Sequence, residues 1–186
     1  MLNTKGFTLI ELLVTVIIVG ILAAMAMPSY YRFLERARTA DVVNTMGTAV
    51  NAQERYYVKR DQYSQHWSHL DAVPETIRTP GVDNGYSSAD NKTYFTKGGG
   101  EAAPNNGFAV TFDLTKNSKF IVAQRVGSNK YTYTIVRPFD EKRFYCLPDT
   151  ANEEDVRLCL DFMGVDSVDL LPADPRAGAR AMGSWF

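Results

Sequence analysis

Among the residues that could do chemistry in this chain, Glu11 has the most unusual surroundings. It is the single charged residue in an otherwise apolar run that extends from Phe7 to Met27. A helix of about 20 apolar residues is long enough to cross the hydrocarbon core of a bilayer. A carboxylate in such a helix costs roughly a few kcal/mol, and less near an end than at the centre. We therefore expect Glu11 to pair with a cation.

The two histidines are a weaker candidate for a metal site. His66 and His69 with Asp71 would supply three zinc ligands at most, and no second cluster of ligands completes the set. Solvated or capping side chains are the simpler interpretation.

Two loop segments also contain residue types that bind ions. The triple glycine at 98–100 does not lead from a strand into a helix, which argues against a phosphate site. The spacing of four acidic and amide residues fits no ordered calcium loop, and turn formation explains them equally well. These four are Asp83, Asn84, Asp90 and Asn91. No nucleophile is paired with a base, so we expect no catalytic residue, no metal and no cofactor.

Cys146 and Cys159 both lie near the carboxyl end. An even pair of cysteines in an exported domain predicts a disulfide. In the chain-entropy model a loop of this length contributes about 3 kcal/mol of stabilisation. The alternative is a cytosolic protein with two free thiols.

The apolar run by itself leaves two interpretations open. A secretory signal peptide would need a shorter apolar stretch of about 7 to 15 residues and a more basic start than Lys5 alone, although the segment 24–26 resembles a cleavage site. A simple membrane anchor would explain the length of the run. Neither interpretation explains Glu11.

The order of residues around the run resembles that of type IV prepilins. A short polar leader ends in Gly6, the sequence Phe7-Thr8-Leu9-Ile10-Glu11 follows, and Pro28 stands just after the apolar run. In that family a dedicated peptidase cuts after the glycine and methylates the new amino terminus, here Phe7. The resemblance implies that Glu11 pairs with the amino terminus of a neighbouring subunit as the helix moves from membrane to fibre.

The basic residues give a conflicting signal about orientation. Arg32, Arg36 and Arg38 follow the apolar run and only Lys5 precedes it, so the positive-inside rule would place the large domain in the cytoplasm. The leader and the cysteines favour export. We expect a single-pass protein of the bacterial inner membrane with a periplasmic carboxyl-terminal domain, which the resemblance then places in an extracellular pilus.

The helix is expected to continue beyond Pro28 to about Tyr57 as an amphipathic segment. Pro28 removes a backbone donor and is predicted to kink the helix, and Gly20 weakens it. The resemblance suggests that the segment between them extends on assembly, and a gently bent continuous helix is the alternative for a monomer. The apolar positions that recur at helical spacing are Leu34, Ala37, Val43, Met46, Val50 and Tyr57.

The fold class expected is α+β, with this long kinked helix packed on a four-stranded antiparallel sheet, followed by a disulfide-bounded region. The strands are predicted from alternating apolar residues joined by short turns. They are Phe108–Leu114, Lys119–Val126, Lys130–Arg137 and Lys142–Leu147. A short helix is predicted to begin after Asn152 and to end at Gly164, and the Trp185-Phe186 end is unusual for a solvated tail. A sheet on a long amino-terminal helix is also the pilin fold.

The predicted organisation has six segments. They are a cleaved leader at 1–6, a transmembrane and assembly helix at 7–28, its amphipathic half at 29–57, a surface loop at 58–107, the sheet at 108–147 and the disulfide-bounded region with its tail at 146–186.

The net charge of −1 does not indicate nucleic-acid binding. The resemblance implies a structural, non-enzymatic subunit of a type IV pilus that serves adhesion, twitching motility or DNA uptake. Its expected partners are identical or homologous pilins, the prepilin peptidase and methyltransferase, and the pilus assembly machinery. The alternatives are a pseudopilin of a type II secretion system, and a membrane-anchored binding or enzymatic domain with a prepilin-like leader.

Overall fold

The structure, a computed structural model, describes residues 7–71, 86–87, 93–95, 107–114, 119–167, 169, 171 and 173–175. The chain divides into two compact units, Met1–Ala37 and Arg38–Phe186. The leader with Gly6, the calcium candidates from Asp83 to Asn91, the glycines at 98–100 and the Trp185-Phe186 end lie outside the described residues.

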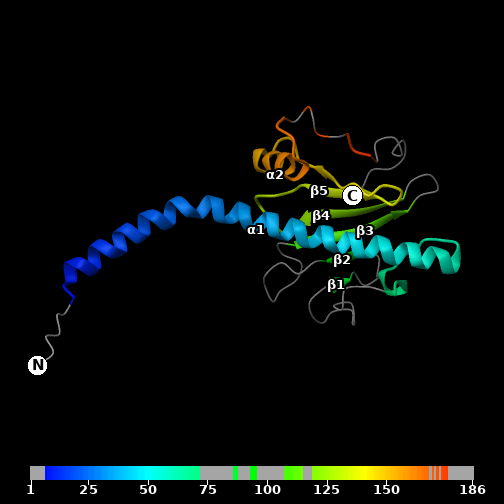
Figure 1. The fold of residues 1–186 in the computed structure, drawn as a ribbon, viewed down its shortest axis with the longest axis horizontal. Coiled ribbons are helices and arrows are strands. Elements are labelled where there is room, and N and C mark those ends of the chain that lie inside the picture. Colours follow the sequence, from blue (N-terminus) through cyan, green and yellow to red (C-terminus); the bar gives the residue numbers. More distant parts are fainter. Residues whose placement is uncertain are drawn as a thin grey trace, which may run out of the picture. The chain divides into compact units, whose positions relative to one another are not determined.

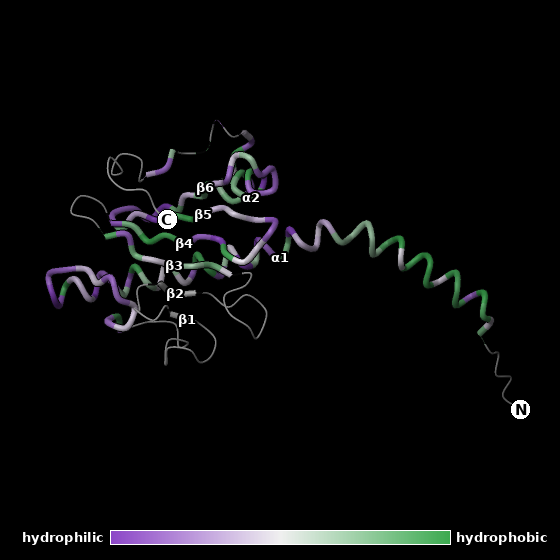
Figure 2. Tube along the Cα trace, turned by 180° about the vertical axis from the view of Figure 1, so that it is seen from behind, coloured by the Kyte–Doolittle hydropathy of each residue, from purple (hydrophilic) through white to green (hydrophobic). Residues whose placement is uncertain are grey.

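Helix α1 (Leu9–Arg60) runs without interruption through Gly20 and Pro28. From Leu9 to Phe33 its large apolar side chains are exposed, with Leu9 at 89% and Phe33 at 67%. Figure 2 shows that hydrophobic residues dominate this part of the helix. By length and composition α1 is the one helix in the described part of the chain that could cross a membrane. The kink at Gly20 and Pro28 stays a prediction.

The second unit contains an antiparallel sheet in which the strands are neighbours in the order of the sequence (Figure 1). The four predicted strands are confirmed, and two short strands extend the sheet beyond β3. The strands are β1 (Tyr86–Ser87), β2 (Thr93–Phe95), β3 (Gly107–Leu114), β4 (Lys119–Val126), β5 (Thr134–Pro138) and β6 (Tyr145–Leu147).

Strand β5 begins at Thr134, four residues later than predicted. The reason is that side chains, rather than a neighbouring strand, bind the backbone N–H groups before it. Ser128 Oγ accepts from the N–H of Lys130 at 3.2 Å and of Tyr131 at 3.0 Å. The carboxylate of Asp155 accepts from the N–H of Thr132. Strand β6 likewise starts at Tyr145 instead of Lys142.

The face of α1 that is buried in the second unit differs from the predicted stripe. Met46 and Val50 are buried as predicted, whereas Ala37 and Tyr57 are exposed and that part of the prediction is wrong. The buried positions recur every three or four residues but include polar side chains. They are Thr39, Val42, Met46, Ala49, Val50, Ala52 and Gln53.

Two of these polar side chains are buried because distant residues satisfy them. Thr39 Oγ1 and the hydroxyl of Tyr133 are 2.7 Å apart. Gln53 binds the backbone of Ser64 at both ends, since its amide donates to the Ser64 carbonyl and its Oε1 accepts from the Ser64 N–H at 3.0 Å. A prediction based on apolar residues alone therefore selects a face of α1 that differs from the face that is buried.

Two further helical segments complete the described fold, the 3₁₀ turn η1 (Trp67–His69) and helix α2 (Glu153–Met163). The predicted caps of α2 are confirmed. The side chain of Asn152 accepts from the N–H of Glu154 at 3.1 Å, and Gly164 adopts a left-handed conformation with φ of 68°. A left-handed residue after a helix is favourable for glycine because it has no Cβ.

Candidate functional site

The amino end of α1 is closed by a reciprocal pair, Thr8 and Glu11. Glu11 Oε2 accepts hydrogen bonds from the Thr8 N–H at 2.9 Å and from the Thr8 hydroxyl at 2.8 Å. In return, the Glu11 N–H donates to Thr8 Oγ1 at 3.3 Å. The Thr8 carbonyl accepts the first helical hydrogen bond, from the Leu12 N–H at 3.3 Å. This arrangement is a capping box, in which each residue satisfies the backbone N–H of the other.

The capping box gives Glu11 a second role that reasoning from the sequence missed. The signal was present as Thr-x-x-Glu directly before an apolar run. These hydrogen bonds partly satisfy the carboxylate, but Thr8 is neutral and leaves its negative charge in place. Pairing with a cation therefore remains compatible with the cap, and the two roles predict different effects of mutation.

The predicted processing residues adjoin this cap. Phe7 directly precedes Thr8 and its side chain is 83% exposed. Cleavage before Phe7 would create a charged amine one residue from the N–H that Glu11 binds. The assignments of Gly6 and Phe7 to cleavage, Phe7 to methylation, and Phe7 and Glu11 to assembly remain predictions.

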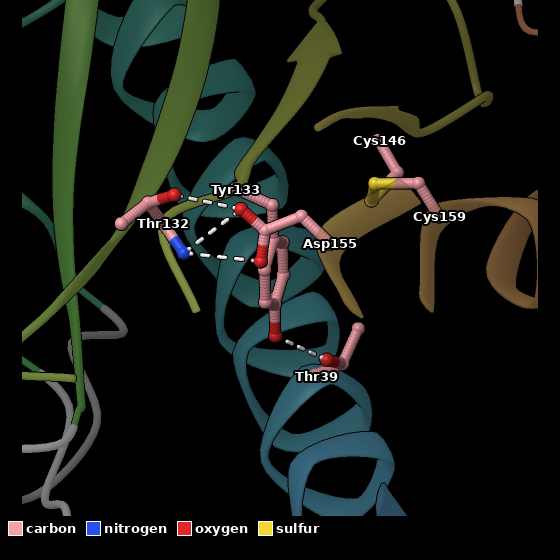
Figure 3. Close-up of a disulfide and its surroundings, with 6 residues drawn as sticks. All are labelled: Thr39, Thr132, Tyr133, Cys146, Asp155 and Cys159. Atoms are coloured by element: carbon pink, nitrogen blue, oxygen red, sulfur yellow. Dashed lines mark hydrogen bonds between the residues drawn. A yellow bond between two sulfur atoms is a disulfide. The ribbon is translucent and has the colours of Figure 1, made fainter. Parts of the chain in front are cut away.

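The predicted disulfide between Cys146 and Cys159 is present and joins β6 to α2 (Figure 3). Both cysteines are fully buried, and their Cα atoms are 5.3 Å apart. It is not the only connection of α2, because the Asn152 amide donates to the Lys130 carbonyl at 2.7 Å. Helix α2 is therefore attached to β6 by a covalent bond and to the segment before β5 by hydrogen bonds.

Asp155 is the buried polar centre of this attachment. Its two carboxylate oxygens accept from the Thr132 N–H at 3.1 and 3.0 Å, and one of them accepts from the Thr132 hydroxyl at 2.7 Å. Burial raises the pKa of Asp155 because it penalises the charged carboxylate, and the hydrogen bonds from Thr132 oppose this effect. From the sequence only the ends of α2, at Asn152 and Gly164, were predicted, and not this role of Asp155.

The zinc candidates have other partners. The rings of His66 and His69 are 5.1 Å apart, but His69 Nδ1 lies 2.9 Å from the hydroxyl of Ser64. The carboxylate of Asp71 binds the guanidinium of Arg55 at 2.8 to 3.1 Å. In the part of the chain that the structure describes, no group of three or more His, Cys, Asp or Glu residues could hold a metal ion.

Comparisons with known proteins agree with the interpretation of the amino-terminal segment. Residues 1–27 match the family model of the prokaryotic N-terminal methylation motif. The chain is 29% identical over 163 residues to the type IV major pilin protein PilE of Neisseria gonorrhoeae, which covers 87% of this chain and 86% of that protein. This chain belongs to the type IV pilin family.

Other relatives of this pilin align mainly over a shorter part. It is 35% identical over 73 residues to the type IV major pilin protein PilA of Myxococcus xanthus, which covers 39% of this chain and 33% of the relative. It is 39% identical over 70 residues to the type IV wide pilus major component PilA4 of Thermus thermophilus, and this alignment covers 38% of this chain and 53% of that protein. The alignments with these relatives thus span about a third to a half of their length. No solved structure gives a significant match.

Membership of this family settles the broad class of the protein. Type IV pilins are structural and not enzymatic, and the long amino-terminal helix, the antiparallel sheet and the disulfide form the pilin fold. The apolar helix and the family are both consistent with a protein that resides in a membrane and then in a pilus.

Proposed function

We propose that this pilin is a structural subunit of a type IV pilus and polymerises through the apolar part of α1. The observation that supports this most is the exposed apolar surface of the first unit, where Leu9, Met25 and Phe33 are 89%, 72% and 67% exposed. Covering apolar surface is favourable by about 25 cal/mol per Å². A bilayer would cover this surface in the single chain, and the same surface of other subunits would cover it in a fibre.

In this proposal the prepilin peptidase removes residues 1–6 and methylates the amine of Phe7. Glu11 then meets an amino terminus in the low-dielectric interior of the fibre. A carboxylate and an amine attract each other more strongly there than in water. This attraction favours the axial offset between neighbouring subunits that places Glu11 beside an amino terminus. Unlike the capping box, this pairing requires the negative charge of Glu11.

The processing step can be tested on the protein from its native cells. Intact mass and amino-terminal sequencing should give a chain that begins at N-methylated Phe7. The mass should also be lower by two hydrogens because Cys146 and Cys159 are oxidised. A mature chain that begins near Met27, or still at Met1, would contradict the proposal.

Two substitutions can separate the role of Glu11 in charge pairing from its role in the capping box. Glu11→Gln keeps a side chain that can accept the Thr8 hydrogen bonds but removes the charge, whereas Thr8→Ala removes the cap hydroxyl and keeps the charge. We expect Glu11→Gln to abolish or strongly reduce fibres seen by electron microscopy, with membrane levels unchanged. Thr8→Ala should retain most of them. Normal fibres from Glu11→Gln would refute the charge pairing, and equal loss in both variants would show that assembly needs the cap as much as the charge.

We propose further that the fibre is a surface pilus, with the subunit passing through the inner membrane and the pilus assembly machinery. The names of the relatives from Neisseria, Myxococcus and Thermus, which are major components of type IV pili, support this over a secretion pseudopilus. Deletion of the gene should remove detached surface fibres and impair adhesion, twitching motility or DNA uptake. Loss of protein secretion with surface fibres intact would favour the pseudopilin alternative.

A further inference from the structure

A ring of basic and aromatic side chains surrounds α1 just after its apolar run. Tyr30, Tyr31 and Phe33 are 58%, 52% and 67% exposed. Arg32 and Arg36, which are about one helical turn apart, are also exposed. Successive residues of a helix are separated by roughly 100° around its axis, so these side chains point to several sides of α1. We name these five residues the basic-aromatic girdle.

The charge that the girdle presents to its surroundings is positive. The segment 30–38 contains three arginines and a single acid, Glu35. Glu35 is fully buried, whereas Arg32 and Arg36 are exposed. A partner that fits the girdle is therefore anionic and also accommodates aromatic side chains.

The girdle lies about one bilayer thickness along α1 from Glu11. None of the residues 12–31 is charged, and Arg32 is 21 positions after Glu11. Helix α1 is continuous over this range, and at 1.5 Å per residue the two positions are roughly 32 Å apart along its axis. The hydrocarbon core of a bilayer is about 30 Å thick. A membrane-spanning α1 with Glu11 at one surface therefore has Arg32 at the other.

The residue types of the girdle suit the boundary between lipid and water. Tyrosine is enriched there because its ring is apolar and its hydroxyl reaches water. The ring centroids of Tyr30 and Tyr31 are 6.3 Å apart in an edge-on arrangement. Arginine can keep its aliphatic stem against apolar surface while its guanidinium donates paired hydrogen bonds to a phosphate.

A lipid surface fits this arrangement better than a single docked protein does. Exposure on several sides of α1 matches a partner that surrounds the helix, whereas one protein would cover one face. The large apolar side chains that precede the girdle are exposed as well, and a helix that is apolar all round is typical of a membrane span. Anionic lipids are favoured over zwitterionic ones because the cationic group of a zwitterionic headgroup offsets its phosphate.

We propose that the basic-aromatic girdle binds the headgroups of anionic phospholipids, with Arg32 as the main phosphate ligand. The site lies at the membrane surface from which the chain continues into its carboxyl-terminal domain, and Tyr30 and Tyr31 anchor the helix at the same depth. In consequence α1 has a defined depth before assembly, and the headgroups are released when the subunit moves into a fibre. This inference rests on the membrane span of α1 proposed above.

The test uses the full chain in bilayers of equal parts phosphatidylcholine and phosphatidylglycerol, in which one lipid at a time carries bromine on its acyl chains. Bromine quenches the fluorescence of a nearby tryptophan, so the ratio of quenching by the two brominated lipids reports which lipid lies beside a reporter. Met27→Trp places a reporter about one turn before Tyr31, at a side chain that is 52% exposed. Leu13→Trp places another near the opposite end of the apolar run, at a side chain that is 54% exposed. The signal of the natural tryptophans is subtracted with the chain that lacks a reporter.

We expect brominated phosphatidylglycerol to quench the Met27→Trp reporter more than brominated phosphatidylcholine does. Arg32→Gln should lower the relative affinity for phosphatidylglycerol about fivefold, since a basic residue near an anionic membrane surface is worth about 1 kcal/mol. Arg32→Lys keeps the charge and should retain most of the preference. The matched control is Arg60→Gln, which removes the same charge from the exposed last turn of α1 and should leave the preference unchanged.

The two reporters separate this inference from the membrane span on which it rests. No quenching at either reporter would show that α1 is outside the bilayer, and would contradict the span and the lipid site together. Quenching at both reporters without a preference for phosphatidylglycerol at Met27→Trp would overturn the lipid site alone. A preference that Arg32→Gln leaves unchanged, or that Arg60→Gln lowers equally, would also overturn it, because the preference would then come from another group or from net charge.

Discussion

Asp155 in α2 accepts three hydrogen bonds from Thr132, a residue 23 positions earlier in the chain. Thr132 is followed by Tyr133, whose hydroxyl lies 2.7 Å from that of Thr39 on α1. Figure 3 shows these contacts beside the disulfide. The segment before β5 thus links α2 to α1 through consecutive residues, and the stability of the second unit should depend on it.

Replacing Asp155 should test this link directly. We expect Asp155→Ala to lower the free energy of unfolding by about 2–3 kcal/mol, because the N–H and hydroxyl of Thr132 lose a charged acceptor. Asp155→Asn should cost less, since an amide oxygen still accepts one hydrogen bond. Denaturant unfolding of the full chain in detergent would measure both. The control is Glu153→Ala in the same turn, whose side chain is 89% exposed and which should have little effect.

The raised pKa of Asp155 also predicts the sign of a pH dependence. A carboxyl whose pKa is higher in the folded than in the unfolded chain binds more protons when folded. Its contribution to stability is fully present below the unfolded pKa and is lost as the pH rises through the folded pKa. We expect the difference in stability between the native chain and Asp155→Asn to change with pH between the unfolded and the folded pKa of Asp155. A difference that stays constant over the acid range would contradict the raised pKa.

Asp71 should behave in the opposite way. The hydrogen bonds from the Arg55 guanidinium lower its pKa, and burial opposes this only in part. Its contribution is therefore present above the unfolded pKa and is lost as the pH falls through the folded pKa. We expect Arg55→Gln to return the pKa of Asp71 toward its ordinary value in a carboxyl NMR titration.

A second substitution serves as a control for that titration. Lys59→Gln should shift the pKa of Asp71 less than Arg55→Gln, because Lys59 Nζ is 3.7 Å from the carboxylate and Arg55 Nη2 is 2.8 Å away. Because the pair is exposed, salt should weaken both effects. Equal shifts in the two variants would show that net charge, and not the hydrogen bonds of Arg55, lowers the pKa.

The disulfide should stabilise the second unit without being required for α2 to dock. We expect the double variant Cys146→Ser with Cys159→Ser to lose about 3 kcal/mol of unfolding free energy, as the chain-entropy model gives for a loop of about 15 residues. The hydrogen bonds of Asn152 and Asp155 should still hold α2 in place. Hydrogen exchange of α2 amides would check this, and exchange at the rate of an unfolded peptide under native conditions would contradict it.

Local patterns in the sequence predicted much of this protein because they depend on short-range stereochemistry. An apolar run with one acid indicated the first half of α1, alternating residues indicated the four main strands, and Asn152 and Gly164 marked the ends of α2. The Thr-x-x-Glu cap at Glu11 is equally local, because it joins residues three positions apart. The cysteine pair was predictable from composition and compartment.

Only the tertiary structure decided which polar groups are buried, and with them which face of α1 packs on the sheet. Thr39 and Gln53 interrupt the apolar pattern, yet both lie in the interior because Tyr133 and Ser64 satisfy them. Burying a polar group costs free energy unless a partner replaces water. That partner can be almost a hundred residues away, so its position cannot be read from periodicity. For the same reason the sequence determined where the helices and strands form, while the role of Asp155 appeared only once α2 was packed against Thr132.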